Sequence, residues 1–229
     1  SEMCIRDRCK IGYVGAFPYA EVISGFTSFY LGVKSVCDSA TMEVKYTNSW
    51  ASFDLEKECA EQLIADGCVL ISQHADTTGA PTACEAKKVP CVGYNIDMIP
   101  TAPDAALTSA TINWGPYYTY AVQSVIEGTA IDTDWSKGVK DGADAITELN
   151  DKTVAKGTKE KVEEAQKGIE DGTIHVFDTS KFTVGGKTLE ELVESGDEDA
   201  TKLQSYIKDG YFHESDVAGG MTSAPAFTF

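Results

Sequence analysis

Short apolar runs alternate with stretches of helical periodicity through the first half of the chain. The apolar runs occupy residues 10–17, 42–50, 68–73, 90–95 and 106–111. Nearly continuous apolar runs of this length are typical of strands that are buried on both faces of a parallel sheet. We therefore predict a strand at each of these positions.

Between these runs the spacing of apolar residues becomes that of an amphipathic helix. The three stripes are Val22, Phe26, Phe29, Tyr30 and Val33; Leu55, Cys59 and Leu63; and Tyr118, Val122, Val125 and Ile126. Strands that alternate with helices imply right-handed crossovers and layers of helices around one sheet. The predicted fold class is α/β, with a doubly wound, mostly parallel sheet.

Beyond residue 129 this alternation becomes less regular. The predicted elements are a helix at 158–171, short edge strands at 173–177 and 181–186, an acidic helical face at 187–209 and a loop-like tail to 229. Gly172 directly follows the first of these helices, which is a common stop signal.

Composition excludes several classes of partner. The net charge is −17, whereas nucleic-acid binding depends on Lys and Arg that neutralise phosphates. The same charge disfavours anionic membrane surfaces. Apolar residues make up 42% of the chain, enough for a core, but no run approaches the roughly 20 residues of a membrane span. We expect no nucleic-acid partner.

The first eight residues, SEMCIRDR, are set aside from the fold. They carry no apolar periodicity, and they match one literal translation of a transposase adaptor used in sequencing libraries. We expect residues 1–8 to be an adaptor-derived leader and the chain to be truncated at its N-terminus. Any signal or anchor would then lie upstream.

Polar and aromatic residues follow the predicted strands, at the edge where open α/β sheets bind ligands. The candidate site residues are Phe17, Trp50, His74, Asp76, Asn95, Asp97, Asn113 and Trp114. This edge has almost no Lys or Arg, so it is poorly suited to a phosphate. It combines flat rings with amides and carboxylates, which favours a small polar ligand.

Each of these residues also has a purely structural interpretation. Asp76, Thr77 or Thr78 would serve as the N-cap of the next helix. The Trp residues would be core aromatics, His74 a loop histidine, and segment 95–97 a turn. Both kinds of interpretation stay open at this point.

The motifs of common catalytic and metal sites are missing from the sequence. His74 and Asp76 would supply two ligands, whereas zinc needs three or four. The seven Cys form no C-x-x-C pair and are expected to be buried apolar residues, with disulfides left open. No G-x-S-x-G, P-loop or G-x-G-x-x-G motif is present. We expect no catalysis, no cofactor and no metal.

Five motifs in order together resemble the basic membrane protein (BMP) family of solute-binding proteins of ABC importers. They are KIGYVGAFPYAEVISGFTSFYLGVKSV, VKYTNSW, LISQHADTTGA, VGYNIDM and LTSATINWGPYY. The resemblance runs from Lys10 to about Phe177. It implies a type I periplasmic-binding-protein fold, in which two α/β lobes close over a ligand. Residues 9–111 would form the second lobe, 112–144 would return to an incomplete first lobe, and 145–229 would complete the second lobe and add the C-terminal tail.

The resemblance also implies roles for individual residues. Trp50 and Trp114 would be aromatic walls against a purine ring, since a stacked base is worth roughly 1–3 kcal/mol. Asp97 would accept hydrogen bonds from the ligand, and His74 and Asp76 would line the floor. Nucleoside receptors of the family hold ribose with a Lys after the fifth strand and a second Asp near Asn95. Neutral or aromatic residues stand here instead, which favours a free base such as adenine.

The resemblance therefore implies that the full-length protein is a lipoprotein and the purine-binding, solute-binding component of an ABC importer. The implied partners are a purine base or nucleoside and an ABC permease, the protein would be a monomer, and its place would be extracytoplasmic and lipid-anchored. A sugar or another small polar solute is an alternative ligand, because the fold does not determine the ligand. An effector domain of a transcription regulator is an alternative function, and an enzyme is a third.

Overall fold

The computed structural model describes residues 9–213. The expected leader and the tail beyond residue 213 lie outside the described residues. The strands are β1 (Lys10–Gly15), β2 (Thr41–Tyr46), β3 (Leu70–His74), β4 (Cys91–Tyr94), β5 (Ala106–Ile112), β6 (Asp144–Ile146), β7 (Ile207–Lys208) and β8 (Tyr211–Phe212). Each of the five predicted strands of the first half overlaps one of β1 to β5.

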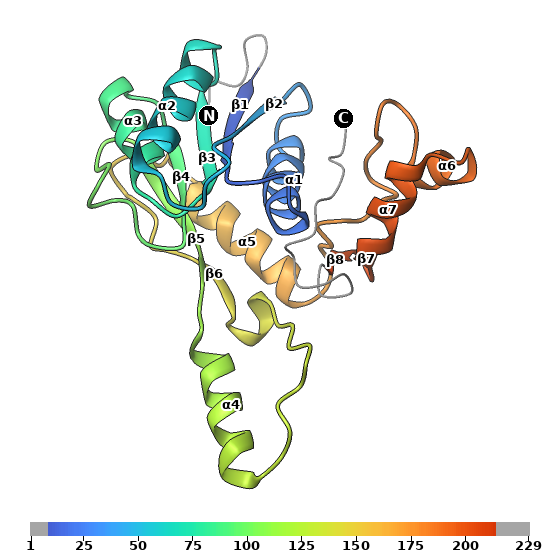
Figure 1. Ribbon diagram of the computed structural model, residues 1–229. Coiled ribbons are helices and arrows are strands. Elements are labelled where there is room, and N and C mark those ends of the chain that lie inside the picture. Colours follow the sequence, from blue (N-terminus) through green and yellow to red (C-terminus); the bar gives the residue numbers. More distant parts are fainter. Residues whose placement is uncertain (1–8, 214–229) are drawn as a thin grey trace.

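The main sheet has six strands in the order β2-β1-β3-β4-β5-β6 (Figure 1). Strands β1 to β5 are parallel, and only β6 pairs antiparallel, with β5. The predicted mostly parallel sheet is therefore confirmed. Because the strands are parallel, their carboxyl ends meet at one edge of the sheet, which is called the carboxyl edge below.

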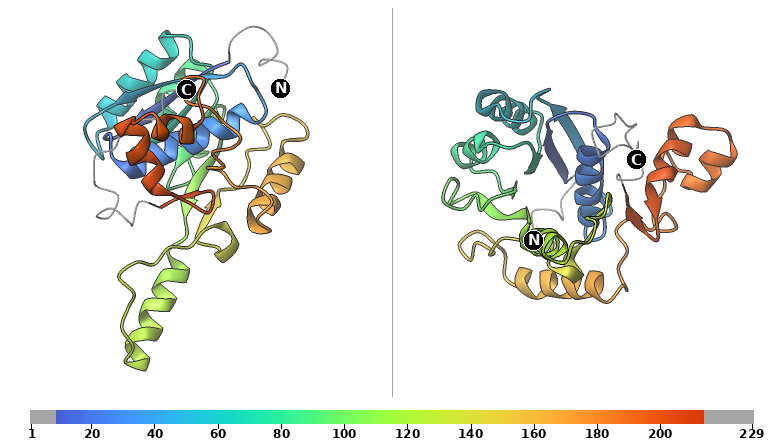
Figure 2. Two further views of the ribbon diagram at one scale, coloured as in Figure 1. Left: turned by 90° about the vertical axis from the view of Figure 1, so that its right-hand side faces the viewer. Right: turned by 60° about the horizontal axis from the view of Figure 1, so that its bottom comes forward.

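Helices cover both faces of this sheet, as a doubly wound fold requires (Figure 2). The α-helices are α1 (Ala20–Lys34), α2 (Phe53–Ala65), α3 (Gly79–Lys87), α4 (Gly115–Glu127), α5 (Thr158–Glu170), α6 (Leu189–Glu194) and α7 (Glu198–Tyr206). Alternate residues of β1 divide the core between the two faces. Tyr13 packs with Phe26 of α1, whereas Val14 packs with Leu63 of α2.

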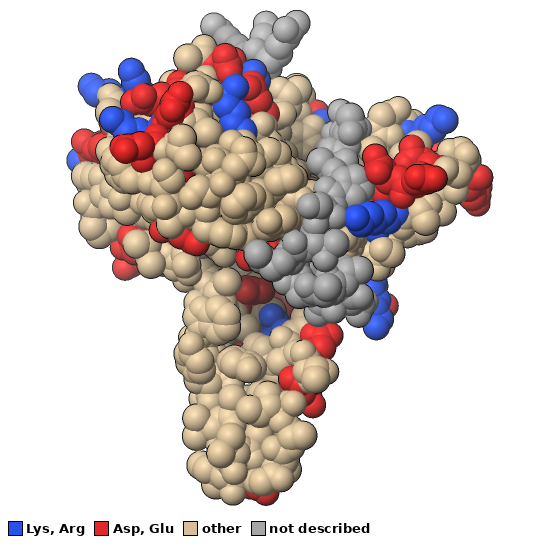
Figure 3. All heavy atoms as spheres, viewed as in Figure 1, with Lys and Arg blue, Asp and Glu red and all other residues tan. Residues whose placement is uncertain are grey.

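Helix α4 projects from the body of the molecule between β5 and β6 (Figure 1). Its apolar stripe is exposed, with exposed fractions of 60% for Tyr118, 59% for Val122 and 73% for Ile126. Figure 3 shows that the surface of this projection carries few charged side chains. The periodicity predicted the helix correctly, but within the described residues the stripe is left largely exposed.

The C-terminal part forms a small cluster of its own beside α1. Leu189, Leu203 and Phe177 are buried there, and the antiparallel pair β7-β8 closes the cluster. The predicted helix at 158–171 and the helical segment at 187–209 correspond to α5 and to α6 with α7. Segment 187–209 is not merely a solvated face, because one side of its helices is buried.

The two predicted edge strands at 173–177 and 181–186 are wrong. The N–H of Ile174 donates to the carbonyl of Gly168 in α5, and the N–H of Phe177 donates to the carbonyl of Gly210. These bonds direct the first segment into the C-terminal cluster and away from the sheet. The second segment contains only one isolated bridge, between Val184 and Lys187.

Among the described residues, no helix is both long and apolar enough to cross a membrane. Four Cys of the described residues are buried, as expected of small apolar side chains: Cys9, Cys68, Cys84 and Cys91. Burial raises the pKa of the Cys68 thiol to about 11, so this group is a neutral apolar residue at neutral pH.

Candidate functional site

The residues that directly follow β1, β2 and β4 stay hydrogen-bonded to a neighbouring strand. The Thr47 N–H donates to the Gly15 carbonyl at 2.9 Å, and the Ala16 N–H donates to the His74 carbonyl at 3.2 Å. The Asn95 N–H donates to the Ala110 carbonyl at 2.7 Å. The predicted site residues after these strands therefore start at the same edge of the sheet, and the sheet's backbone hydrogen bonds extend to them.

Three aromatic rings gather where β1 and β2 end. The rings of Phe17 and Tyr19 are stacked, with centroids 5.1 Å apart. The Trp50 ring is tilted against both, at 5.5 Å from Phe17 and 6.1 Å from Tyr19. All three side chains are only half-buried. Two of the predicted residues, Phe17 and Trp50, are thus brought together in one partly exposed aromatic cluster.

The loop after β3 is attached to the loop that carries Trp50. The Asp76 N–H donates to the Trp50 carbonyl at 2.8 Å. The Gln73 side-chain amide holds the same loop from below, because its Nε2 donates to the carbonyls of Ala75 at 2.7 Å and Thr77 at 3.0 Å. Asp76 therefore lies next to the loop that carries Trp50, and it is exposed.

The expected capping role falls to Thr77. Its hydroxyl accepts a hydrogen bond from the Gly79 N–H at 3.1 Å, at the start of α3. Thr78 is the N-cap residue of α3 by position, but its side chain accepts no capping bond. The start of α3 therefore does not need the Asp76 side chain as a cap.

His74 is buried between α1 and β4. Its Nε2 lies 3.3 Å from Oε1 of Glu21, and its ring lies 4.4 Å from the ring of Tyr94, measured between centroids. Glu21 belongs to the first turn of α1, which begins at the carboxyl edge directly after β1. The structure thus adds Glu21 and Tyr94 to the surroundings of His74.

Asn95 and Asp97 form a turn at the end of β4. Asn95 has a φ of 72°, in the left-handed region that Asn tolerates better than most residues. The carboxylate of Asp97 accepts from the Ile99 N–H at 2.9 Å. Both residues are exposed, so the turn-forming interpretation holds for the pair in this structure.

Asn113 and Trp114 lie at the root of α4. The side-chain amide of Asn113 makes two hydrogen bonds to the backbone. Its Nδ2 donates to the Gly142 carbonyl, and its Oδ1 accepts from the Gly115 N–H. The Trp114 ring contacts the rings of Tyr117 and Tyr118 on α4, and the residue is 53% exposed. The described residues thus do not bring Trp114 into contact with the Trp50 cluster.

The electrostatics of this edge are acidic. The pKa of Asp76 is raised, chiefly by partial burial and further by the charge of Glu21, while His74 acts in the opposite direction. Burial also raises the pKa of the Glu56 carboxyl, which lies beneath the same loops, and of the Tyr13 phenol beside His74. Among the described residues, no group of three or more His, Cys, Asp or Glu could hold a metal ion.

The family model described as "Bmp: ABC transporter substrate-binding protein PnrA-like" matches residues 6–178 of the chain. The chain belongs to this family. The resemblance that the five motifs carry is therefore confirmed.

Two curated proteins with different named ligands are similar to this chain. A purine-binding protein of Brucella abortus is 32% identical over 166 residues, covering 72% of this chain and 47% of its own. A Haloferax volcanii protein named as an ABC transporter glucose-binding protein is 31% identical over 179 residues, covering 78% of this chain and 45% of its own. The chain thus spans about half the length of these two relatives.

Solved structures establish the same fold. A solute-binding protein of an ABC transporter from Aeropyrum pernix K1 has a TM-score of 0.62 at 18% identity, covering 87% of this chain and 65% of its own. A transcriptional activator of the comK gene from Bacillus halodurans has a TM-score of 0.63 at 19% identity, covering 74% of this chain and 59% of its own. The described Bmp chain has the periplasmic-binding-protein type of fold.

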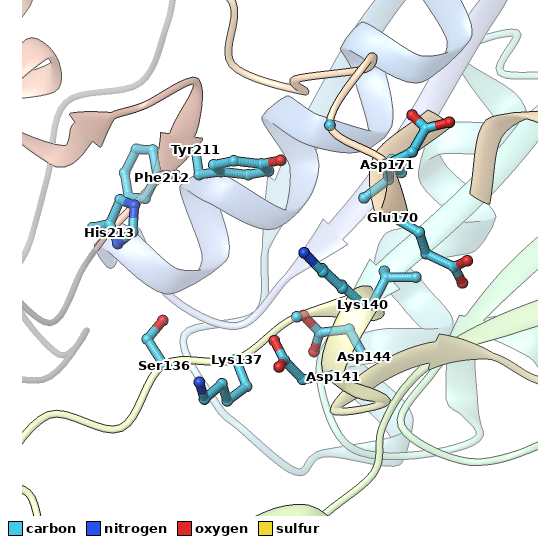
Figure 4. A pocket seen from close by; sticks show the side chains of 14 residues that line it. Ser136, Lys137, Lys140, Asp141, Asp144, Glu170, Asp171, Tyr211, Phe212 and His213 are labelled. Carbon is cyan, nitrogen blue, oxygen red and sulfur yellow. The ribbon is translucent and has the colours of Figure 1, made fainter. Parts of the chain in front are cut away.

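A separate cavity of about 470 Å³ lies between the end of α5, the 3-10 helix Val139–Asp141 and β8 (Figure 4). Charged side chains of both signs, among them Lys140 and Asp144, share it with the ring of Tyr211 (Figure 4). None of the eight predicted site residues lines this cavity. This cavity is therefore distinct from the carboxyl edge, where the predicted site residues lie.

Sequence reasoning missed Glu21, Tyr19 and Tyr94 at this edge. Tyr94 is the last residue of a correctly predicted strand, so the rule that selected Asn95 could have included it. Glu21 and Tyr19 lie at the start of the helix that follows the first strand. They could have been found from the sequence, because a helix that follows a strand after a short loop must begin at the edge of the sheet where that strand ends.

Proposed function

We propose that the full-length protein is the solute-binding component of an ABC importer and that it binds an adenine-like purine base. It would hold the base in a cleft between two lobes, release it unaltered to a permease, and work outside the cytoplasm. Membership of the Bmp family supports the general role. The identity of the ligand rests on the arguments that follow.

The aromatic cluster at the carboxyl edge is the observation that carries the proposal. Phe17, Tyr19 and Trp50 form a partly exposed aromatic surface, and the backbone of Asp76 is hydrogen-bonded to that of Trp50. A purine base offers a π-face for stacking and N–H groups for hydrogen bonding to carboxylates, which matches this combination. A relative that binds purine is 32% identical to this chain.

A free base is favoured over a nucleoside or nucleotide. The candidate site residues include no Lys or Arg, so nothing among them would neutralise a phosphate. In nucleoside receptors of the family, a Lys after the fifth strand and a second Asp near Asn95 hold ribose. This chain has Asn113 and Trp114 after β5 and Asn95 after β4 instead.

We further propose that the projecting helix α4 belongs to a first lobe. The division would then be residues 9–111 in the second lobe, 112–144 returning to the first, and 145–229 in the remainder of the second. The exposed Tyr118, Val122 and Ile126 support this, because an unpartnered apolar stripe of this size favours burial against another layer. Strands β5 and β6 would be the connections between the lobes, and the closed protein would be a monomer on a lipid anchor.

A sugar is the second candidate ligand. The relative named as a glucose-binding protein is 31% identical to this chain, and aromatic rings also pack against the apolar faces of sugar rings. A regulator's effector domain would share the fold, as the activator from Bacillus halodurans does. An upstream helix-turn-helix in the full-length reading frame would favour the regulator, and an upstream lipoprotein signal would favour the importer.

Calorimetric titration of the full-length protein distinguishes these ligands. Adenine, adenosine, guanine, glucose and galactose should be compared at equal concentrations. We expect saturable one-site binding of adenine, at least tenfold tighter than that of adenosine, with adenine recovered unchanged afterwards. Binding of a sugar without any purine would contradict the proposal, and so would conversion of a nucleoside by the protein.

A further inference from the structure

Glu21 occupies a position that no sequence motif assigned to the site. It lies in the first turn of α1, two residues after Tyr19 of the aromatic cluster. Its Oε1 lies 3.3 Å from Nε2 of His74, with 34% of the Glu21 side chain and 8% of the His74 side chain exposed. The carboxylate therefore has one oxygen on a buried imidazole and a partly exposed remainder at the carboxyl edge.

The imidazole of His74 faces α1 and not the edge. Its Nδ1 lies 2.5 Å from where a Cβ atom of residue 25 would stand, so the ring fills the space that Gly25 leaves open. Its Nε2 faces Glu21, and the Tyr94 ring lies against it with centroids 4.4 Å apart. With both nitrogens directed toward α1, His74 is placed to orient Glu21 and not to contact a ligand directly.

Other polar groups of the edge already serve the backbone. The Asp97 carboxylate accepts from the Ile99 N–H, and the Asn113 amide bonds to Gly142 and Gly115. The Glu56 carboxylate is fully buried and accepts from two backbone N–H groups. Glu21 and Asp76 remain as partly exposed acidic residues whose backbones adjoin the aromatic cluster.

We propose that Glu21 is a specificity-determining residue of this site, whose carboxylate, held by His74, accepts a hydrogen bond from an N–H group of the ligand. This inference rests on the proposed function and names the chemistry that the site selects. A heterocycle with an amino group or a ring N–H is bound by a charge-assisted hydrogen bond, which is stronger than a bond between neutral groups. A heterocycle without that N–H leaves the carboxylate desolvated and unpaired, which is costly.

The test uses Glu21→Gln in the full-length protein and calorimetry with adenine, purine and 9-methyladenine. Purine lacks the amino group and 9-methyladenine lacks the ring N–H of the imidazole moiety. We expect Glu21→Gln to weaken adenine binding at least tenfold, and to weaken the analogue that lacks the contacted N–H by less than threefold. Glu21→Asp, which keeps the charge, should retain more affinity than Glu21→Gln. Glu58→Gln, at an exposed position of α2, is the matched control and should bind adenine as the wild type does.

The positioning role of His74 has its own readout, the discrimination between adenine and the analogue that lacks the contacted N–H. The imidazole holds one carboxylate oxygen of Glu21, with His74 Nε2 at 3.3 Å from Glu21 Oε1. His74→Gln, whose side-chain amide keeps a hydrogen-bond donor, should therefore retain more of this discrimination than His74→Ala. Unchanged discrimination in a folded His74→Ala variant would show that the imidazole does not orient Glu21.

The outcomes separate this inference from the proposed function. If the wild type binds adenine and a folded Glu21→Gln variant binds it with the same affinity, the role of Glu21 is overturned and the proposed function is not. An equal loss for adenine and for both analogues would overturn it as well, since no particular N–H would then be recognised. Failure of the wild type to bind any purine would overturn the proposed function and the inference together.

Discussion

The carboxylate of Glu56 connects two loops of the carboxyl edge, because its Oε2 accepts a hydrogen bond from the Thr77 N–H at 3.2 Å. Its Oε1 accepts from the Ser52 N–H at 3.4 Å. One loop carries Trp50 and the other carries Asp76, which are also joined directly by a backbone hydrogen bond. A residue with no contact to solvent thus sets the spacing of two candidate ligand-binding residues.

Replacing Glu56 should therefore destabilise the protein. In Glu56→Gln the side chain keeps the shape but loses one acceptor, and an unsatisfied buried N–H costs about 1–3 kcal/mol. We expect a decrease of that size in the free energy of unfolding, measured by urea denaturation. Glu58→Gln, on an exposed position of the same helix, should change stability by less than about 0.5 kcal/mol. Equal effects of the two variants would contradict the role of the buried carboxylate.

Gly25 should be required because of the imidazole next to it. A Cβ atom at position 25 would lie 2.5 Å from His74 Nδ1 and 3.0 Å from the Tyr13 hydroxyl oxygen. Overpacking of this kind costs roughly 1–3 kcal/mol, so Gly25→Ala should lower the free energy of unfolding by that amount. In a His74→Ala background the same substitution should cost clearly less, because the contacting ring is gone.

Gly32→Ala is the matched control for Gly25→Ala. It lies in the same helix, and a Cβ atom there would meet nothing within 4 Å. Ala should then raise stability by about 0.5–1 kcal/mol, since Gly is the poorer helix former. A cost of Gly25→Ala that is the same with and without His74 would show that the imidazole does not cause it.

Glu43 should make stability depend on pH in the acid range. Hydrogen bonds from Lys10 at 2.5 Å and Lys45 at 2.9 Å lower the pKa of Glu43 to about 2 from its usual 4.5. Above pH 4.5 the carboxylate is charged in both states, and the stabilisation is fully present. As pH falls toward 2, only the unfolded chain takes up the proton, so this stabilisation is lost.

The variant Glu43→Gln tests this linkage. It should be less stable than the wild type near pH 6, and the difference should disappear as the pH approaches 2. Urea denaturation at a series of pH values measures both curves. Glu163→Gln, whose carboxylate lies 4.0 Å from Lys159 on the surface of α5, is the control and should show no such convergence. A constant gap for Glu43→Gln across the series would rule out the linkage.

The sequence predicted the sheet well because its signals there are local. Each parallel strand is a compact apolar run, and the carboxyl edge follows from the strand directions alone. That rule identified Phe17 and Trp50, which the structure brings together. Segment 173–177 has the same apolar character, but the Phe177 N–H pairs with Gly210 across the C-terminal cluster. No local pattern distinguishes these two outcomes.

The missed part of the candidate site has a similar cause. Glu21 and His74 are 53 positions apart in the sequence and meet only because α1 crosses the sheet above β3. Gly25, which leaves room for the His74 ring, lies within a predicted helix, and from the sequence alone a Gly there indicates only a weak helix former. Contacts of this kind depend on the side-chain packing between a helix and the strand beneath it, which periodicity does not encode.

Trp114 is the remaining predicted wall of the cleft, and its role is tested by ligand affinity. It is 53% exposed and contacts only rings of its own helix among the described residues, so its outer surface is open to a partner. Stacking of a base is worth roughly 1–3 kcal/mol, which corresponds to about a 5- to 150-fold change in affinity. In the full-length protein, Trp114→Ala should therefore weaken adenine binding at least tenfold by calorimetry. Gln123→Ala, at an exposed polar position of the same helix, should leave the affinity within twofold. If Trp114→Ala behaves like Gln123→Ala, the base does not stack on Trp114, and the aromatic contact must come from the Phe17, Tyr19 and Trp50 cluster alone.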